Sequence, residues 1–97
     1  METQVRIYGI AAGHLDDFVV AWTAGVKPLR KRRGFTHIGA WSIEATSEFV
    51  WVLGYDGHEG FEAADAAYYA SDERHSIDPD PAQWIESVQE HPARRVV

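Results

Sequence analysis

Two β-prone segments, residues 35–44 and 48–56, are separated only by the short connection Ala45-Thr46-Ser47. A link of this length joins antiparallel strands, because parallel strands need a crossover of about a dozen residues or more. Residues at every second position share one side of a strand. One side of this hairpin is therefore expected to be aromatic, and it would hold His37, Trp41 and Ile43 from the first strand and Phe49, Trp51, Leu53 and Tyr55 from the second.

Hydrophobic spacing predicts two long helices around this hairpin. Residues 3–10 alternate as a first strand, and the apolar residues of 15–29 then recur every three or four positions, which is typical of an amphipathic helix. Pro28 lies inside this helix and has no backbone donor, so a kink or a break near Gly25 is expected. The alanine-rich segment 61–70 predicts a second helix.

The end of the chain completes a βαββαβ order. Residues 71–78 are polar and are expected to be irregular. Asp80 and Pro81 suit the N-cap and the first position of a short third helix, with an apolar face formed by Trp84, Ile85 and Val88. Residues 92–97 would return as a last strand. This order predicts one α+β domain over residues 1–97, a ferredoxin-like sandwich with an antiparallel sheet and both long helices on one face.

That arrangement leaves the second face of the sheet bare. At 97 residues, 45% of them hydrophobic, the chain has much apolar material for a small core. Packing two such sheets together would cover the bare faces, so the sequence predicts a homodimer in the form of a dimeric α/β barrel.

Composition and motifs exclude several classes of protein. The chain has no cysteine, which removes disulfides, thiolate nucleophiles and cysteine-based metal centres. Its net charge of −6 argues against a nucleic-acid partner. No apolar run is long enough to span a membrane, so a cytoplasmic protein without a membrane partner is expected. No nucleotide, flavin, hydrolase or metal motif occurs, so no cofactor and no metal are predicted.

Short motifs in the first three quarters of the chain resemble the NIPSNAP family. They are Val5-Arg6-Ile7-Tyr8, then Gly13-His14-Leu15 leading into a helix with Trp22, Pro28 and Gly34, and the hairpin segments Gly39-Ala40-Trp41 and 49–55. The layout is also similar to that of antibiotic-biosynthesis monooxygenases. The resemblance implies a homodimer whose pocket, between sheet and helices, binds a small aromatic or lipid-like ligand. Residues 78–84 stretch the Asp-Pro-Trp-like segment of the family, so this part of the chain departs from the family's pattern.

Arg6 and Tyr8 are the first candidate catalytic pair. They occupy alternate positions of the first strand and should project to the same side. A guanidinium there could neutralise an enolate or a carboxylate, and a phenol could donate a hydrogen bond. The alternative is that Arg6 forms a structural salt bridge and Tyr8 only packs.

The other candidates are histidines and aromatic residues. His37 and His75 could transfer protons near neutral pH, and planar ligand walls could come from Trp41, Trp51, Tyr55, Tyr68 and Tyr69. The alternative for each is a structural role in the core. His14 or His58, each beside carboxylates, lacks the spacing of a metal site.

Three hypotheses for the function remain open. The first is a cofactor-independent monooxygenase, cyclase or isomerase that acts on an aromatic or polyketide-like compound. The second is a non-catalytic ligand-binding or protein-interaction module. The third is haem breakdown, with His14, His37 or His75 as the axial ligand. A cavity in which a histidine or tyrosine meets Arg6 would favour an enzyme, and a filled interface would favour a module.

Overall fold

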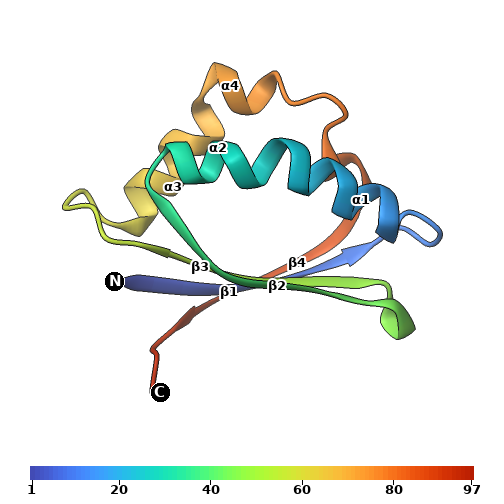
Figure 1. Cartoon of the computed structure of the whole chain (residues 1–97), viewed down its shortest axis with the longest axis horizontal. Coiled ribbons are helices and arrows are strands. Elements are labelled where there is room, and N and C mark those ends of the chain that lie inside the picture. The colour runs from blue at the N-terminus through green and yellow to red at the C-terminus, as the bar shows by residue number, and fades with distance from the viewer.

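A four-stranded antiparallel sheet forms one layer of the computed structural model, which describes residues 1–97 (Figure 1). The strands follow the order β2-β3-β1-β4 across the sheet. Their bounds are β1 Glu2–Ile10, β2 Phe35–Ile43, β3 Glu48–Tyr55 and β4 Ile85–Ala93. All three neighbouring pairs are antiparallel, with β1 between β3 and β4. The predicted ferredoxin-like α+β sandwich is confirmed.

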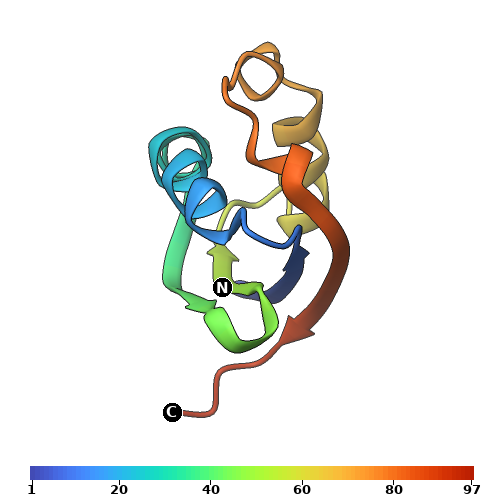
Figure 2. The same ribbon diagram turned by 90° about the vertical axis from the view of Figure 1, so that its right-hand side faces the viewer.

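All helices lie on one face of this sheet, as the view along the layers shows (Figure 2). We call this the inner face, and the uncovered side the outer face. The first long helix comprises α1 (Leu15–Ala21), a π turn (Trp22–Val26) and α2 (Lys27–Arg32), and the second helical unit comprises α3 (Phe61–Ala70) and α4 (Asp72–His75). No helix combines the length and the apolar character needed to cross a membrane.

The π turn in the first long helix lies where Pro28 predicted a break. In an α-helix the ring of Pro28 would collide with the carbonyl of Ala24, and no N–H would bond to that carbonyl. The chain widens instead, and the N–H of Lys27 donates to the carbonyl of Trp22, five residues back. The sequence therefore predicts the place of the irregularity and its cause.

Three predictions for the last third of the chain are wrong. Residues 81–84 form one turn of 3₁₀ helix rather than a longer helix, and the last strand, β4, runs over Ile85–Ala93 rather than 92–97. The free edge of β1 pairs with the chain as far back as Ile85, which ends the helical turn. Segment 71–78 also contains α4, because the Ser71 hydroxyl accepts a hydrogen bond of 3.1 Å from the N–H of Arg74.

A β-bulge in β2 corrects the predicted faces of the hairpin. His37 pairs with Leu53, but Gly39 pairs with Val52, so Ile38 is an extra residue in the ladder. One extra residue shifts the alternation by one position. His37 therefore stays on the inner face, whereas Trp41 lies on the outer face together with Ile43, and the predicted grouping of these three residues is wrong.

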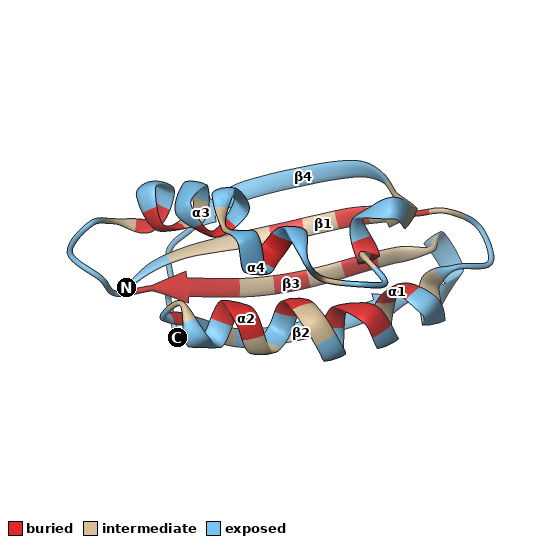
Figure 3. Cartoon of the chain, turned by 90° about the horizontal axis from the view of Figure 1, so that it is seen from above, coloured by how far each residue is buried: buried red, intermediate tan, exposed pale blue.

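The core lies between the inner face and the helices. Buried positions alternate along β1 and β3 and form stripes on the helices above them (Figure 3). Fourteen buried hydrophobic residues form one cluster, and most of the largest are aromatic. The outer face carries three half-buried valines and one half-buried isoleucine from β1 and β3, namely Val5, Val50, Val52 and Ile7.

Candidate functional site

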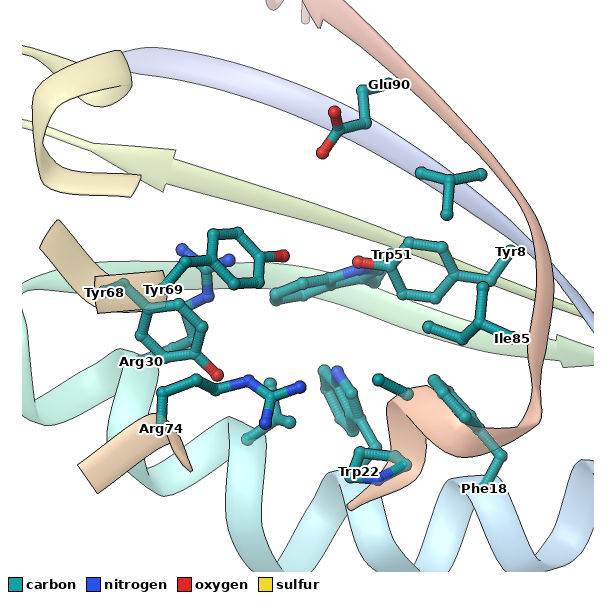
Figure 4. Close-up of a pocket in the computed structure, with 14 residues that line it drawn as sticks. Tyr8, Phe18, Trp22, Arg30, Trp51, Tyr68, Tyr69, Arg74, Ile85 and Glu90 are labelled. Atoms are coloured by element: carbon teal, nitrogen blue, oxygen red, sulfur yellow. The ribbon is translucent and has the colours of Figure 1, made fainter. Parts of the chain in front are cut away.

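A cavity of about 290 Å³ opens between the inner face of the sheet and the helices. Ten of its fourteen lining residues are hydrophobic, so the space is mainly apolar. The walls come from every layer: Tyr8 of β1, Trp22 of the π turn, Trp51 of β3, Tyr68 of α3, Arg74 of α4 and Val88 of β4 (Figure 4). The last third of the chain closes the side that the two long helices leave open.

Aromatic rings form the wall of the cavity on the side of α1. The rings of Trp22 and Trp51 meet edge to face with centroids 5.3 Å apart, and Tyr8 meets Phe18 in the same way at 5.9 Å. Phe18, Trp22 and Val26 recur at four-residue spacing and so share one helix face. Such rings fit a planar apolar molecule.

Several polar groups of the residues that line the cavity are unpaired donors. Six buried side-chain nitrogen or oxygen atoms have no hydrogen-bond partner within the protein. Five of the six belong to residues that line the cavity: Trp22 Nε1, Trp51 Nε1, Arg30 Nε, Arg74 Nε and the Tyr68 hydroxyl. Buried polar groups are normally paired, so a cluster of unpaired donors points to a ligand that supplies acceptors.

Arg6 lies beside the cavity in an ion-pair network. It is 0% exposed, and its Nη2 lies 2.9 Å from Asp65 Oδ2 and 3.1 Å from Glu90 Oε2. Its Nη1 donates to the Tyr69 hydroxyl at 3.1 Å, and its Nε donates to the Gln4 side chain. The protein itself therefore occupies every nitrogen of this guanidinium.

Arg30 shares the same carboxylate. Its Nη1 donates to Asp65 Oδ1 at 2.7 Å, so one carboxylate from α3 holds a guanidinium of α2 and, through its other oxygen, Arg6 of β1. The guanidinium carbon of Arg30 lies 3.7 Å from the centre of the Tyr68 ring and 4.6 Å from that of Phe35. These stacked rings stabilise the buried cation.

Tyr8 faces the cavity as a neutral donor. It is 6% exposed, and this burial raises the pKa of Tyr8 to about 12. Burial also raises the pKa of Tyr68. Both phenols stay protonated at neutral pH, and in Figure 4 the Tyr8 hydroxyl points toward Trp51.

The structure brings together four of the predicted site residues. Tyr8, Trp51, Tyr68 and Tyr69 all line the cavity, and Arg6 lies directly behind Tyr69. Their roles in binding or catalysis stay predictions.

The other four predicted residues lie elsewhere. His37 stacks on the Trp51 ring, its Nε2 donates to the carbonyl of Lys27 at 3.0 Å, and burial lowers its pKa. His75 is exposed on α4, Trp41 lies on the outer face, and Tyr55 packs against Phe35 outside the cavity. No histidine lines the cavity.

Three charged residues that line the cavity were not among the residues predicted from the sequence. For Arg30 the sequence holds a usable signal, because Trp22, Val26 and Arg30 recur at four-residue spacing and so share one helix face. Arg74 and Glu90 gave no comparable signal, because they lie in segments whose structure was predicted wrongly.

Comparison with known proteins supports the fold. The sequence matches no protein-family model and no curated protein. A NIPSNAP domain protein from Burkholderia xenovorans superposes with a TM-score of 0.83 at 16% identity, over 99% of this chain and 95% of that one. A NIPSNAP family protein from Agrobacterium tumefaciens gives 0.84 at 14% identity, over 98% and 92%. The chain has the NIPSNAP fold.

The second predicted resemblance is also found, at greater distance. A putative antibiotic biosynthesis monooxygenase from Nitrosomonas europaea superposes with a TM-score of 0.71 at 12% identity, over the full length of both chains. Both resemblances expected from the sequence motifs are thus confirmed at the level of fold. Identities this low show shared architecture, and function has to be argued from the cavity itself.

Proposed function

We propose that this NIPSNAP-fold protein binds a small planar molecule that is mainly apolar and carries oxygen acceptors. The observation that carries the proposal is the cluster of five unpaired buried donors in an aromatic cavity. Aromatic walls would hold the ring system, and the donors would select its oxygens. The volume of about 290 Å³ lies near the lower end of ligand pockets, which favours one or two fused rings over a long lipid.

A cofactor-independent monooxygenase, cyclase or isomerase is the second candidate. It is favoured by Tyr8, whose buried hydroxyl is a neutral donor beside the Trp51 indole and could bind a carbonyl or enolate oxygen. Turnover of a bound compound that Tyr8→Phe abolishes would support it over binding alone. Haem breakdown is less favoured, because none of the three proposed axial histidines lines the cavity.

The working unit in this proposal is a homodimer joined through the outer face. Trp41 and Ile43 are 55% and 39% exposed there, beside the half-buried valines of β3. The centre of this face carries no charge, so a two-fold axis through it would bring no like charges together. The cytoplasmic location expected from the sequence stays a prediction.

An NMR titration that follows the indole N–H resonances of the tryptophans tests the binding proposal directly. The chain has four tryptophans, of which Trp22 and Trp51 line the cavity and Trp41 lies on the outer face. Titration with neutral 2-naphthamide and with 2-naphthoate should shift the Trp22 and Trp51 resonances, because the naphthalene ring packs against both indoles, and should leave Trp41 unmoved.

A cavity-filling variant supplies the control. Val26→Phe puts a ring into the cavity and should abolish the shifts, whereas Val20→Phe, at a 68% exposed position of the same helix, should preserve them. If neither compound moves Trp22 or Trp51, or if Val26→Phe binds as well as the parent protein, the binding proposal is wrong.

A further inference from the structure

We propose that the ligand carries an ionised acidic group, of the carboxylate class, and that this group binds at the end of the cavity formed by Arg30, Tyr68 and Arg74. This inference rests on the proposed binding function and narrows its ligand. It assigns the polar end of the ligand to α2, α3 and α4, and the apolar end to Phe18, Trp22 and Trp51.

Arg74 supplies the first observation. Its side chain is 11% exposed, and Nη2 lies 3.0 Å from Asp80 Oδ1. Asp80 is 47% exposed, so the partner of Arg74 lies half in water. The Nε atom of Arg74 is buried and has no partner. In Figure 4 the guanidinium of Arg74 extends toward the cavity, on the side of the Tyr68 hydroxyl.

Tyr68 and Arg30 supply further donors at the same end. Each is 1% exposed, and each has an unpaired buried polar atom, the hydroxyl of Tyr68 and Nε of Arg30. The stacking of the Tyr68 ring on the Arg30 guanidinium holds both groups in place. Two cations and a phenol therefore present donors from three separate helices.

The charges around this end favour an anion over a neutral acceptor. Three arginines, Arg6, Arg30 and Arg74, are paired here with three carboxylates, those of Asp65, Glu90 and Asp80. The arginine side chains are 1–11% exposed and the carboxylates 20–47% exposed, so water screens the negative groups more than the positive ones. Glu90 is the only one of these carboxylates that lines the cavity. A carboxylate ligand would accept charge-assisted hydrogen bonds from the unpaired guanidinium nitrogens, and such bonds are about twice as strong as neutral ones.

A matched pair of probes tests the inference. 2-Naphthoate and 2-naphthamide have nearly the same shape, but only the first is ionised at neutral pH. Calorimetric titration of the full chain should give a dissociation constant about tenfold lower for naphthoate, because hydrogen bonds from a guanidinium to a carboxylate are stronger than those to a neutral amide.

Substitution of Arg74 should remove this preference. In Arg74→Gln the naphthoate affinity should fall about tenfold further than the naphthamide affinity, so that the two dissociation constants become nearly equal. The control is Arg33→Gln, which removes the same charge from an arginine that is 31% exposed, lies outside the lining of the cavity and is paired with Glu73, the residue before Arg74 in the sequence. It should preserve the preference.

A second variant gives a gain that misfolding cannot produce. Asp80→Asn keeps an oxygen to accept the N–H of Ala82, which lies 2.9 Å from Asp80 Oδ1, and removes the charge that competes for Arg74. Naphthoate should bind it more tightly than the parent protein.

The outcomes separate the two proposals. Equal affinity for naphthoate and naphthamide would overturn the acidic-group inference and leave the binding function standing. An Arg74→Gln variant that weakens both probes equally would also overturn it, since Arg74 would then act on the shape of the cavity. Failure of both probes to bind would overturn both proposals.

Discussion

Tyr8 is the cavity residue whose protonation the fold controls most directly. Burial raises the pKa of Tyr8 to about 12, against an ordinary value of about 10 in an unfolded chain. Below pH 10 the phenol is neutral in both states. Between pH 10 and 12 the unfolded chain has lost this proton while the folded protein keeps it. The free energy of unfolding must therefore fall as the pH rises through this range.

Comparison with Tyr8→Phe measures how much of this loss of unfolding free energy comes from Tyr8. Chemical denaturation at pH 8 and pH 11 should show the parent protein losing about 1 kcal/mol more than the variant, because only the parent has this proton to lose. All other titrating groups are common to both proteins and cancel in the comparison. Equal losses would contradict the assignment of the raised pKa to Tyr8.

The sequence correctly predicts which residues of β1 face the interior, but it does not predict the partners of those residues. Alternation correctly places Arg6 and Tyr8 on one side of β1, because the period of a strand is fixed by its backbone. The partner of Arg6 is Asp65, fifty-nine residues away, and no local pattern indicates that pair. The structure shows the salt-bridge alternative for Arg6, so a catalytic role for it stays a prediction.

At the scale of elements, the π turn packs closely against the segment that follows α4. A methyl group added at Gly25 would lie 2.6 Å from Cγ2 of Ile77, which is a branch of that side chain rather than its flexible end. Glycine costs a helix about 1 kcal/mol relative to alanine, yet overpacking costs about 1–3 kcal/mol. The contact with Ile77 therefore decides whether an alanine at Gly25 raises or lowers the free energy of unfolding.

We expect Gly25→Ala to lower the free energy of unfolding by about 1 kcal/mol in denaturant titrations. In an Ile77→Ala background the colliding methyl is gone, and the same substitution should be neutral or stabilising because alanine favours the helix. A loss of equal size in both backgrounds would show that the contact with Ile77 is not responsible.

The elements that the sequence predicts poorly depend on features that leave no regular pattern in the sequence. Prediction from periodicity assumes a regular alternation, so the one extra residue at Ile38 moves every later side chain of β2 to the opposite face of the sheet from the one predicted. Gly39 leaves room for the Trp41 ring on the outer face, since an added methyl would collide with that ring. The start of β4 depends on the free edge of β1, which is a tertiary contact and has no local signature.

At the scale of the whole molecule, the layer arrangement follows from the order of strands and helices and was predicted correctly. The proposed pairing of two outer faces can be tested through the mass of the protein in solution. By light scattering after gel filtration, the parent protein should have twice the mass of one 10.9 kDa chain, because pairing of two outer faces removes apolar surface from water.

Trp41→Lys should give a monomer, since it places a charge on the exposed part of that face. Val20→Lys, at an exposed position of α1 on the helical side, should remain a dimer. A monomeric parent protein at micromolar concentration would contradict the proposed homodimer, and so would a dimer of Trp41→Lys.

In two arginines beside the cavity, different nitrogen atoms of the same guanidinium have different roles. In Arg30 and Arg74 an outer nitrogen is anchored to a carboxylate of the protein, while the inner Nε remains available. The anchors fix the rotamer of a long and otherwise flexible side chain before any ligand arrives. Part of the entropy loss that usually accompanies capture of an acid is thereby incurred during folding. The carboxylates of Asp65 and Asp80 would then set the geometry of recognition at this end of the cavity without touching the ligand.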